Sequence, residues 1–207
     1  MKAILCLGDS ITHGRGEMPS IGWVGRLKDY YEGQEFYHCV FNLGIPGNTS
    51  KDMLKRIDIE AKARAIYRRP DSEYIITISV GTNDMGGIGS PDAVIISPRK
   101  FRKNIFSLIR KARKYVQKVV FISTLPVDES RSPVRNFYFT NEKQEEYNNI
   151  VRECCKKEDV LFLDLYSDWI KKDYLKLLHD DVHPNEKGYR LMYEQIKEFL
   201  IEKGLIE

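Results

Sequence analysis

The chain has 207 residues, of which 42% are hydrophobic, 30% charged and 11% aromatic. This composition supports a packed core, and it excludes a disordered tail, a collagen-like fibre and a membrane-spanning protein. Lys and Arg number 33 against 30 Asp and Glu, a formal net charge of +3, so the charge gives no reason to expect a nucleic-acid partner. The length suits a single domain over residues 1–207.

Predicted strands alternate with predicted helices along the whole chain. The strands are short segments rich in β-branched and aromatic residues, at 2–7, 35–43, 74–80, 118–124 and 160–165. Most are almost continuously apolar, as expected for parallel strands buried on both faces. Helical spacing of apolar residues predicts helices over 23–31, after Thr49 and Asp52, over 101–112, after an Asn141 cap, and from Asn185 to Gly204. The alternation predicts a three-layer α/β/α fold.

The cysteines and the first residues bear on location in the cell. Cys6, Cys39, Cys154 and Cys155 lack the spacing of a zinc or redox site, so we expect reduced thiols. The apolar stretch 3–7 is too short for a signal peptide. Both observations favour a cytoplasmic protein.

Polar and glycine-rich segments follow the predicted strands. Residues 8–12 (GDSIT) follow the first strand, 42–47 (NLGIPG) the second and 81–84 (GTND) the third, while 180–184 (DDVHP) precede the last helix. The carboxyl ends of parallel strands meet at one edge of the sheet, where open α/β sheets bind their ligands. We therefore expect these segments to lie close together.

The residue types in these segments suit acyl transfer. A serine hydroxyl such as that of Ser10 needs a base to take its proton, and His183 is suited to that role. Asp180, three residues earlier, can orient the imidazole. A flexible backbone amide at Gly44 and the side-chain amide of Asn83 can donate to a developing oxyanion. Taken singly, each has an ordinary explanation as a helix cap, a turn or a loop residue; their joint placement favours catalysis.

These blocks, in this order over nearly the whole chain, resemble the SGNH or GDSL hydrolases. The resemblance implies a flavodoxin-like, five-stranded parallel sheet of order 2-1-3-4-5, with no metal and no cofactor. It implies Ser10 as nucleophile with His183 and Asp180, and an oxyanion hole made by the Ser10 and Gly44 amides and the Asn83 side chain. The implied activity is hydrolysis of esters or thioesters through an acyl-enzyme. Asp181 is an alternative to Asp180, although the three-residue spacing favours Asp180.

Two loops are expected to determine the substrate, which we predict to be a small ester: a short-acyl ester, an acetylated sugar, a lysophospholipid or a thioester. The loop 85–97 leaves the third strand directly after Asn83, and the loop 126–140 carries Phe137 and Tyr138. Their aromatic residues would form an apolar wall or a stacking face; equally, they would cover the protein's own core. The sequence leaves the oligomeric state open.

Parts of the sequence are also compatible with two other function classes and with one surface interaction. A phosphate- or flavin-binding module would use a loop with Ser10, Thr12, Gly14 and Gly16, but Asp9 would place an anion beside the phosphate. A non-catalytic sugar-binding relative would lack one catalytic residue. The stretch 99–118 has nine basic residues and no acidic one; we interpret it as a solvated helix face, with adsorption to an anionic membrane as the minor alternative.

Overall fold

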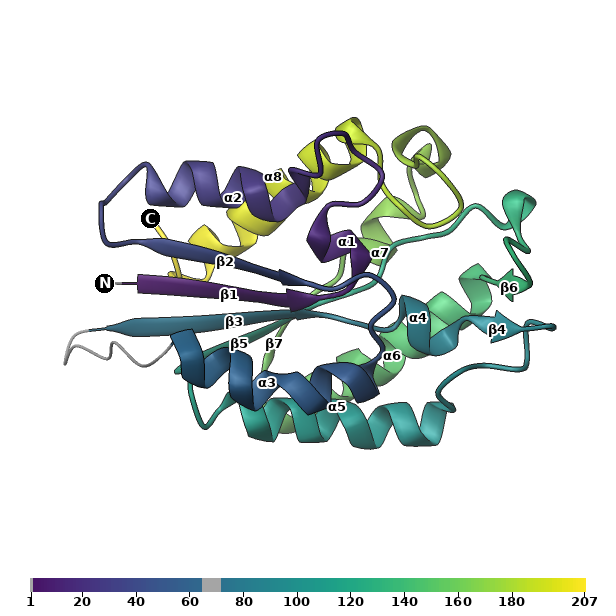
Figure 1. The fold of residues 1–207 in the computed structure, drawn as a ribbon, viewed down its shortest axis with the longest axis horizontal. Helices are drawn as coiled ribbons and strands as arrows, with labels where there is room; N and C mark the ends of the chain where they lie inside the picture. The colour runs from purple at the N-terminus through teal and green to yellow at the C-terminus, as the bar shows by residue number, and fades with distance from the viewer. Residues whose placement is uncertain (1, 65–71) are drawn as a thin grey trace.

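A parallel sheet of five strands forms the centre of the molecule (Figure 1). The computed structural model describes residues 2–64 and 72–207. The strands lie in the order β2 (Cys39–Gly44), β1 (Lys2–Gly8), β3 (Glu73–Ser79), β5 (Lys118–Ile122) and β7 (Leu161–Leu163). Counted along the chain, this is the order 2-1-3-4-5, so the predicted sheet is confirmed.

Helices cover both faces of the sheet and give the three predicted layers (Figure 1). One face carries α2 (Gly22–Glu32) and α8 (Glu186–Glu202), together with the short α1 (Ser10–His13) and α7 (Leu165–Trp169). The other carries α3 (Ser50–Arg64), α5 (Pro98–Ala112) and α6 (Asn141–Glu158). Alternate residues of β1 enter the two cores: Leu5 and Leu7 face one, Ile4 and Cys6 the other. This two-sided burial explains why the strands are continuously apolar.

The helix ends show how tertiary contacts choose between similar residues. The last helix, α8, begins after Asn185, close to the predicted start, and the Asn185 side chain caps it by accepting from the Gly188 amide at 3.1 Å. The predicted Asn141 cap of α6 is wrong: the cap is Thr140, whose hydroxyl accepts from the Lys143 amide at 3.3 Å. The Asn141 side chain instead exchanges two 3.0 Å hydrogen bonds with the backbone of Val127 in the loop after β5.

The second strand is shorter than predicted. It begins at Cys39 rather than at residue 35, because the preceding residues form a turn in which the His38 amide donates to the Glu35 carbonyl at 2.9 Å. The His38 ring stacks on Tyr31 of α2 with 4.2 Å between ring centroids. His38 is therefore a turn residue that packs against a helix.

Short elements gather at the carboxyl edge of the sheet. They are α4 (Thr82–Met85), β4 (Gly87–Ile88), β6 (Phe137–Tyr138) and the 3₁₀ turns η2 (Glu129–Arg131) and η3 (Tyr174–Leu177). β4 and β6 pair antiparallel, so the two loops that were expected to determine the substrate are joined to each other. Both chain termini lie at the opposite end of the sheet (Figure 1). Among the described residues, no helix is long and apolar enough to span a membrane, and all four cysteines are free thiols.

Candidate active site

Three side chains from the two ends of the chain form one hydrogen-bonded row. The Ser10 hydroxyl oxygen lies 2.8 Å from His183 Nε2. On the other side of the ring, His183 Nδ1 lies 2.8 Å and 3.0 Å from the two carboxylate oxygens of Asp180. A carboxylate only accepts hydrogen bonds, so Nδ1 carries the proton and Nε2 is free to accept from the Ser10 hydroxyl. The residues predicted from separate blocks therefore meet.

Local backbone contacts fix the row in place. Ser10 is the first residue of α1, immediately after β1, and Asp9 caps this helix by accepting from the Ile11 amide at 2.9 Å. Asp180 accepts from the Val182 and His183 amides at 3.0 Å and 2.7 Å. Burial would raise the pKa of Asp180, but the hydrogen bonds from the His183 ring and backbone hold it well below its usual range.

Asp181, the alternative carboxylate, does not contact the imidazole. Its side chain is 6% exposed, and its Oδ2 has no hydrogen-bond partner among the described residues. Burial first, and the charge of Asp180 second, raise the pKa of the Asp181 carboxyl. Of the two neighbouring carboxylates, Asp180 is the one that orients His183.

Ser10 opens on a cavity of about 470 Å³. His183, Asp180 and Asn83 also line it, together with Ile11, Arg15, Pro46, Gly47, Thr82, Val134, Arg135, Phe137, Phe139, Asp181 and Val182. Asn83 is placed by α4, and its side-chain nitrogen donates to the Asn48 carbonyl at 3.1 Å and lies 3.4 Å from Asp9 Oδ2. A serine hydroxyl, an imidazole and a side-chain amide thus face one space large enough for a small substrate.

Phe137 and Tyr138, both predicted to bind substrate, are separated by the strand that carries them. Phe137 lines the cavity, as does Phe139, whereas the lining does not include Tyr138. Phe137 and Tyr138 are the two residues of β6, and successive side chains of a strand point to opposite sides, while Phe139 directly follows the strand. Tyr138 therefore does not line the cavity that Ser10 faces, and Phe139 lines it without having been predicted.

Comparisons with known proteins agree with this geometry. The family model of the GDSL-like lipase/acylhydrolase family matches residues 6–191. The chain belongs to this family. The resemblance seen in the sequence is confirmed.

Individual relatives are distant but cover much of the chain. The uncharacterized lipoprotein YqeF of Bacillus subtilis is 25% identical over 94% of this chain and 88% of its own length. Esterase TesA of Pseudomonas aeruginosa is 28% identical over 58% of this chain and 53% of its own length. The crystal structure of a lipase/acylhydrolase from Enterococcus faecalis superimposes with a TM-score of 0.77, at 24% identity, over 100% of this chain and 98% of that one; this last likeness concerns the fold.

In this GDSL-like chain, the glycine predicted to bind the oxyanion, Gly44, does not face the cavity. The Gly44 amide already donates to the Asn42 side chain at 2.9 Å, and Gly44 is absent from the cavity lining. A Cβ on Gly44 would lie 2.2 Å from the His13 backbone nitrogen, so the glycine lets α1 pack against β2. Gly47 lines the cavity instead, at φ +80°, and no described residue accepts a hydrogen bond from its amide.

A buried carboxylate joins two of the loops that line the cavity. Both oxygens of Asp84, which is fully buried, accept from the Ser50 amide at the start of α3, at 3.0 Å and 2.9 Å. The Ser50 hydroxyl also donates to Asp84 and accepts from the Asn104 side chain at 2.8 Å. Burial raises the pKa of Asp84 to about 7 and that of Asp9 to about 6.

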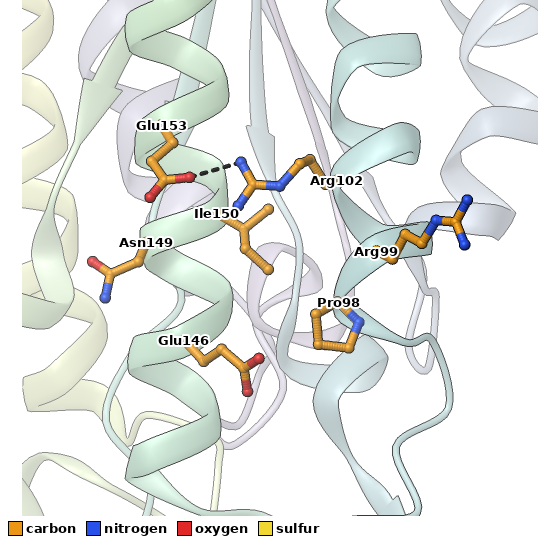
Figure 2. A pocket seen from close by; sticks show the side chains of 7 residues that line it. All are labelled: Pro98, Arg99, Arg102, Glu146, Asn149, Ile150 and Glu153. Atoms are coloured by element: carbon orange, nitrogen blue, oxygen red, sulfur yellow. Dashed lines mark ion pairs between the residues drawn. The ribbon is translucent and has the colours of Figure 1, made fainter.

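A second cavity, of about 300 Å³, lies between α5 and α6 (Figure 2). Its lining mixes charges: Arg102 pairs with Glu153 at 2.7 Å, while Arg99 points away from both glutamates (Figure 2). Neither a nucleophile nor a histidine lines it. Within residues 2–64 and 72–207, no group of three or more His, Cys, Asp and Glu side chains is arranged to hold a metal ion.

Replacing Gly44 with Ala should destabilise the fold. The added Cβ would overlap the His13 backbone, so we expect the free energy of unfolding to fall by about 2 kcal/mol or more. Gly204→Ala is the matched control, because Gly204 has φ +64° but nothing within 4 Å of its Cβ position, and it should lose only about 1 kcal/mol. Equal losses in urea unfolding would contradict this interpretation of Gly44.

Asp84 should make stability depend on pH. Its folded pKa of about 7 is above the unfolded value of about 4, so the folded state holds a proton that the unfolded chain has released. The free energy of unfolding from this group therefore falls as pH rises from about 4 to about 7. In urea unfolding at several pH values, the free energy of unfolding should fall less with rising pH in Asp84→Asn than in the unmodified protein. Asp29→Asn, at an exposed site, is the control. An unchanged fall in Asp84→Asn would refute this prediction.

Proposed function

We propose that this member of the GDSL-like family is a serine esterase that cleaves carboxylic esters through an acyl-enzyme on Ser10. The observation that carries the proposal is the continuous hydrogen-bonded row from Ser10 through His183 to Asp180, with its serine end on a cavity. A serine oxygen at 2.8 Å from a neutral imidazole nitrogen can lose its proton while it attacks a carbonyl carbon. Asp180 stabilises the imidazolium that results.

The first half of the reaction forms the acyl-enzyme. Ser10 Oγ bonds to the ester carbon as His183 Nε2 takes the hydroxyl proton, and the carbonyl oxygen becomes an oxyanion. His183 then gives this proton to the leaving alcohol oxygen as the bond between carbon and that oxygen breaks. In the second half, His183 takes a proton from water, the hydroxide adds to the acyl carbon, and Ser10 Oγ leaves with the proton from His183.

Three N–H groups are suited to bind the oxyanion. Ser10 is the first residue of α1, so its amide has no acceptor within the helix. The Gly47 amide has no acceptor among the described residues. Asn83 lines the same cavity, and of the two N–H groups of its side chain one donates to Asn48 at 3.1 Å while the other makes only a long 3.4 Å contact with Asp9, which an oxyanion can replace. We therefore assign the oxyanion hole to the Ser10 and Gly47 amides and the Asn83 side chain, with Gly47 replacing the expected Gly44.

The phosphate-loop alternative is less well supported by these contacts. A Cβ on Gly16 would lie 2.3 Å from the Pro184 carbonyl oxygen, and one on Gly14 would lie 2.9 Å from the Ser20 carbonyl oxygen. These glycines allow protein backbone to approach, so they are not an open cradle for phosphate. The Ser10 hydroxyl is engaged with His183, and Asp9 is buried directly before it. The non-catalytic alternative predicts a missing catalytic residue, and all three are present.

The identity of the ester substrate and the location of the protein in the cell are further proposals. A short-acyl ester, an acetylated sugar, a lysophospholipid and a thioester all stay open as substrates of the proposed reaction. The cytoplasmic location stays a prediction, and the relative YqeF is named a lipoprotein.

A fluorophosphonate probe tests the nucleophile directly. We expect the intact protein to be labelled at Ser10, and labelling to disappear in His183→Ala because the base is lost. Ester turnover should fall by about 10⁴-fold or more in Ser10→Ala, while Ser107→Ala, which changes a serine on the exposed side of α5, should keep full turnover. Peptide mapping of the label to another serine would contradict the mechanism.

Removing the Asn83 amide should slow the chemical step. We expect Asn83→Ala to lower kcat by ~10²–10³-fold with little change in KM, because the oxyanion exists only beyond the ground state. Asn149→Ala, at an exposed site in the second cavity (Figure 2), is the matched control. Circular dichroism would verify that both variants fold. A kcat for Asn83→Ala equal to that of the control would remove Asn83 from the oxyanion hole.

A further inference from the structure

Two arginines without acidic partners line the cavity beside Ser10. Arg15 and Arg135 are both exposed, and neither guanidinium group has an ion pair or a hydrogen bond with any described residue. Other arginines nearby are paired: Arg131 lies 3.0 Å from Asp128, and Arg26 lies 2.5 Å from Glu17. The cavity therefore has two free cationic groups at its wall, although the chain has acids to pair with arginines elsewhere.

Arg135 is held at the cavity by an unusual backbone. It stands at φ +49° and the next residue, Asn136, at φ +71°, which makes them the two central residues of a tight hairpin turn. Val134 and Phe137 close the turn with backbone hydrogen bonds of 3.0 Å and 2.9 Å, and Gly89 donates to the Asn136 carbonyl at 3.0 Å. Glycine and asparagine adopt these angles far more readily than arginine. An arginine at this position therefore suggests that its side chain has a function.

Arg15 reaches the cavity from a different segment of the chain, the one that follows α1. Its amide donates to the Ser10 carbonyl at 2.9 Å, and its carbonyl accepts from the Tyr189 hydroxyl of α8 at 2.6 Å. The backbone that carries this guanidinium is thus tied both to the nucleophile residue and to a fully buried tyrosine. Only the long side chain is free to move toward a bound molecule.

The two acids in the cavity wall, Asp180 and Asp181, form no ion pair with either arginine among the described residues. The oxygens of Asp180 are engaged by the His183 ring and by two backbone amides. Asp181 is 6% exposed, and its Oδ2 is enclosed. The Asp180 side chain is 41% exposed, but both of its oxygens already have hydrogen-bond partners. Arg15 and Arg135 are the two cationic groups of the lining, and both lie free of partners among the described residues, next to the apolar side chains of Val134 and Phe137.

We propose that the substrate is an ester that carries an anionic group, a carboxylate or a phosphate, which Arg15 and Arg135 bind while Ser10 attacks the ester carbonyl. This inference rests on the proposed esterase function and narrows its substrate class. Guanidinium groups bind carboxylates and phosphates through paired, charge-assisted hydrogen bonds. A neutral ester of the same shape would leave both arginines without a partner and would gain nothing from them.

The test compares esters that differ in charge but little in shape. Acetyl esters with the anion on the alcohol are 4-acetoxybenzoate and 4-acetoxyphenyl phosphate, with methyl 4-acetoxybenzoate as their neutral counterpart. Monophenyl adipate carries the anion on the acyl group, and phenyl hexanoate is its neutral counterpart. We expect at least one anionic ester to be preferred over its neutral counterpart in kcat/KM, and the preference to weaken as ionic strength rises.

Substitution of the two arginines should remove the preference. We expect Arg15→Gln combined with Arg135→Gln to lower kcat/KM by about tenfold or more for the preferred anionic ester, and by less than about threefold for its neutral counterpart. Glutamine, like arginine, has a Cβ, so the substitution at Arg135 leaves the steric strain at φ +49° unchanged. Arg135→Lys should keep part of the preference. Arg99→Gln, an unpaired arginine of the second cavity (Figure 2), is the control and should leave both rates unchanged.

The outcomes separate this inference from the proposed function. If neutral and anionic esters are hydrolysed and their ratio in the double variant equals that in Arg99→Gln, the anionic substrate class is wrong while the esterase function stands. If the unmodified protein hydrolyses none of the five esters and no fluorophosphonate reacts at Ser10, the esterase function fails and this inference fails with it.

Discussion

The geometry of the cavity depends on one buried carboxylate. Asp84 accepts from the backbone and the hydroxyl of Ser50, and so it ties the loop that follows β3 to the loop between β2 and α3. Asn83 is its immediate neighbour and donates to Asn48, which itself directly follows Gly47. Two of the three groups assigned to the oxyanion hole therefore owe their relative position to contacts made away from any substrate, in the protein interior, where a hydrogen-bonded polar group is strongly constrained.

The parts of the fold that sequence predicts are those fixed by burial and chain topology. Strands buried on both faces are almost continuously apolar, so β1 and β3 are recognisable from the sequence alone. Parallel strands bring their carboxyl ends to one edge, which is why Ser10 and Asn83 could be placed together. Asp180 and His183 were recognisable because their interaction is local, across three residues of one turn.

The parts that failed depend on contacts between distant residues. Gly44 ends β2 and Gly47 follows it three residues later, and only the approach of His13 shows that Gly44 serves packing. Tyr138 and Phe139 differ in which way they face, and that follows from the pairing of β6 with β4, two strands of two residues each. The Asn141 side chain hydrogen-bonds to the backbone of Val127, so Thr140 caps α6 instead. No local propensity encodes these choices.

The placement of the proposed general base and its carboxylate on one short turn has a mechanical consequence. Asp180 binds both the imidazole and the backbone amides of residues 182 and 183, so the pair behaves as a rigid unit within the segment that precedes α8. The link from this unit to Ser10 is a single hydrogen bond across 173 positions of sequence. A shift of that segment would leave the imidazole correctly protonated and oriented while withdrawing it from the hydroxyl, so reactivity would be lost by separation and regained without any proton rearrangement.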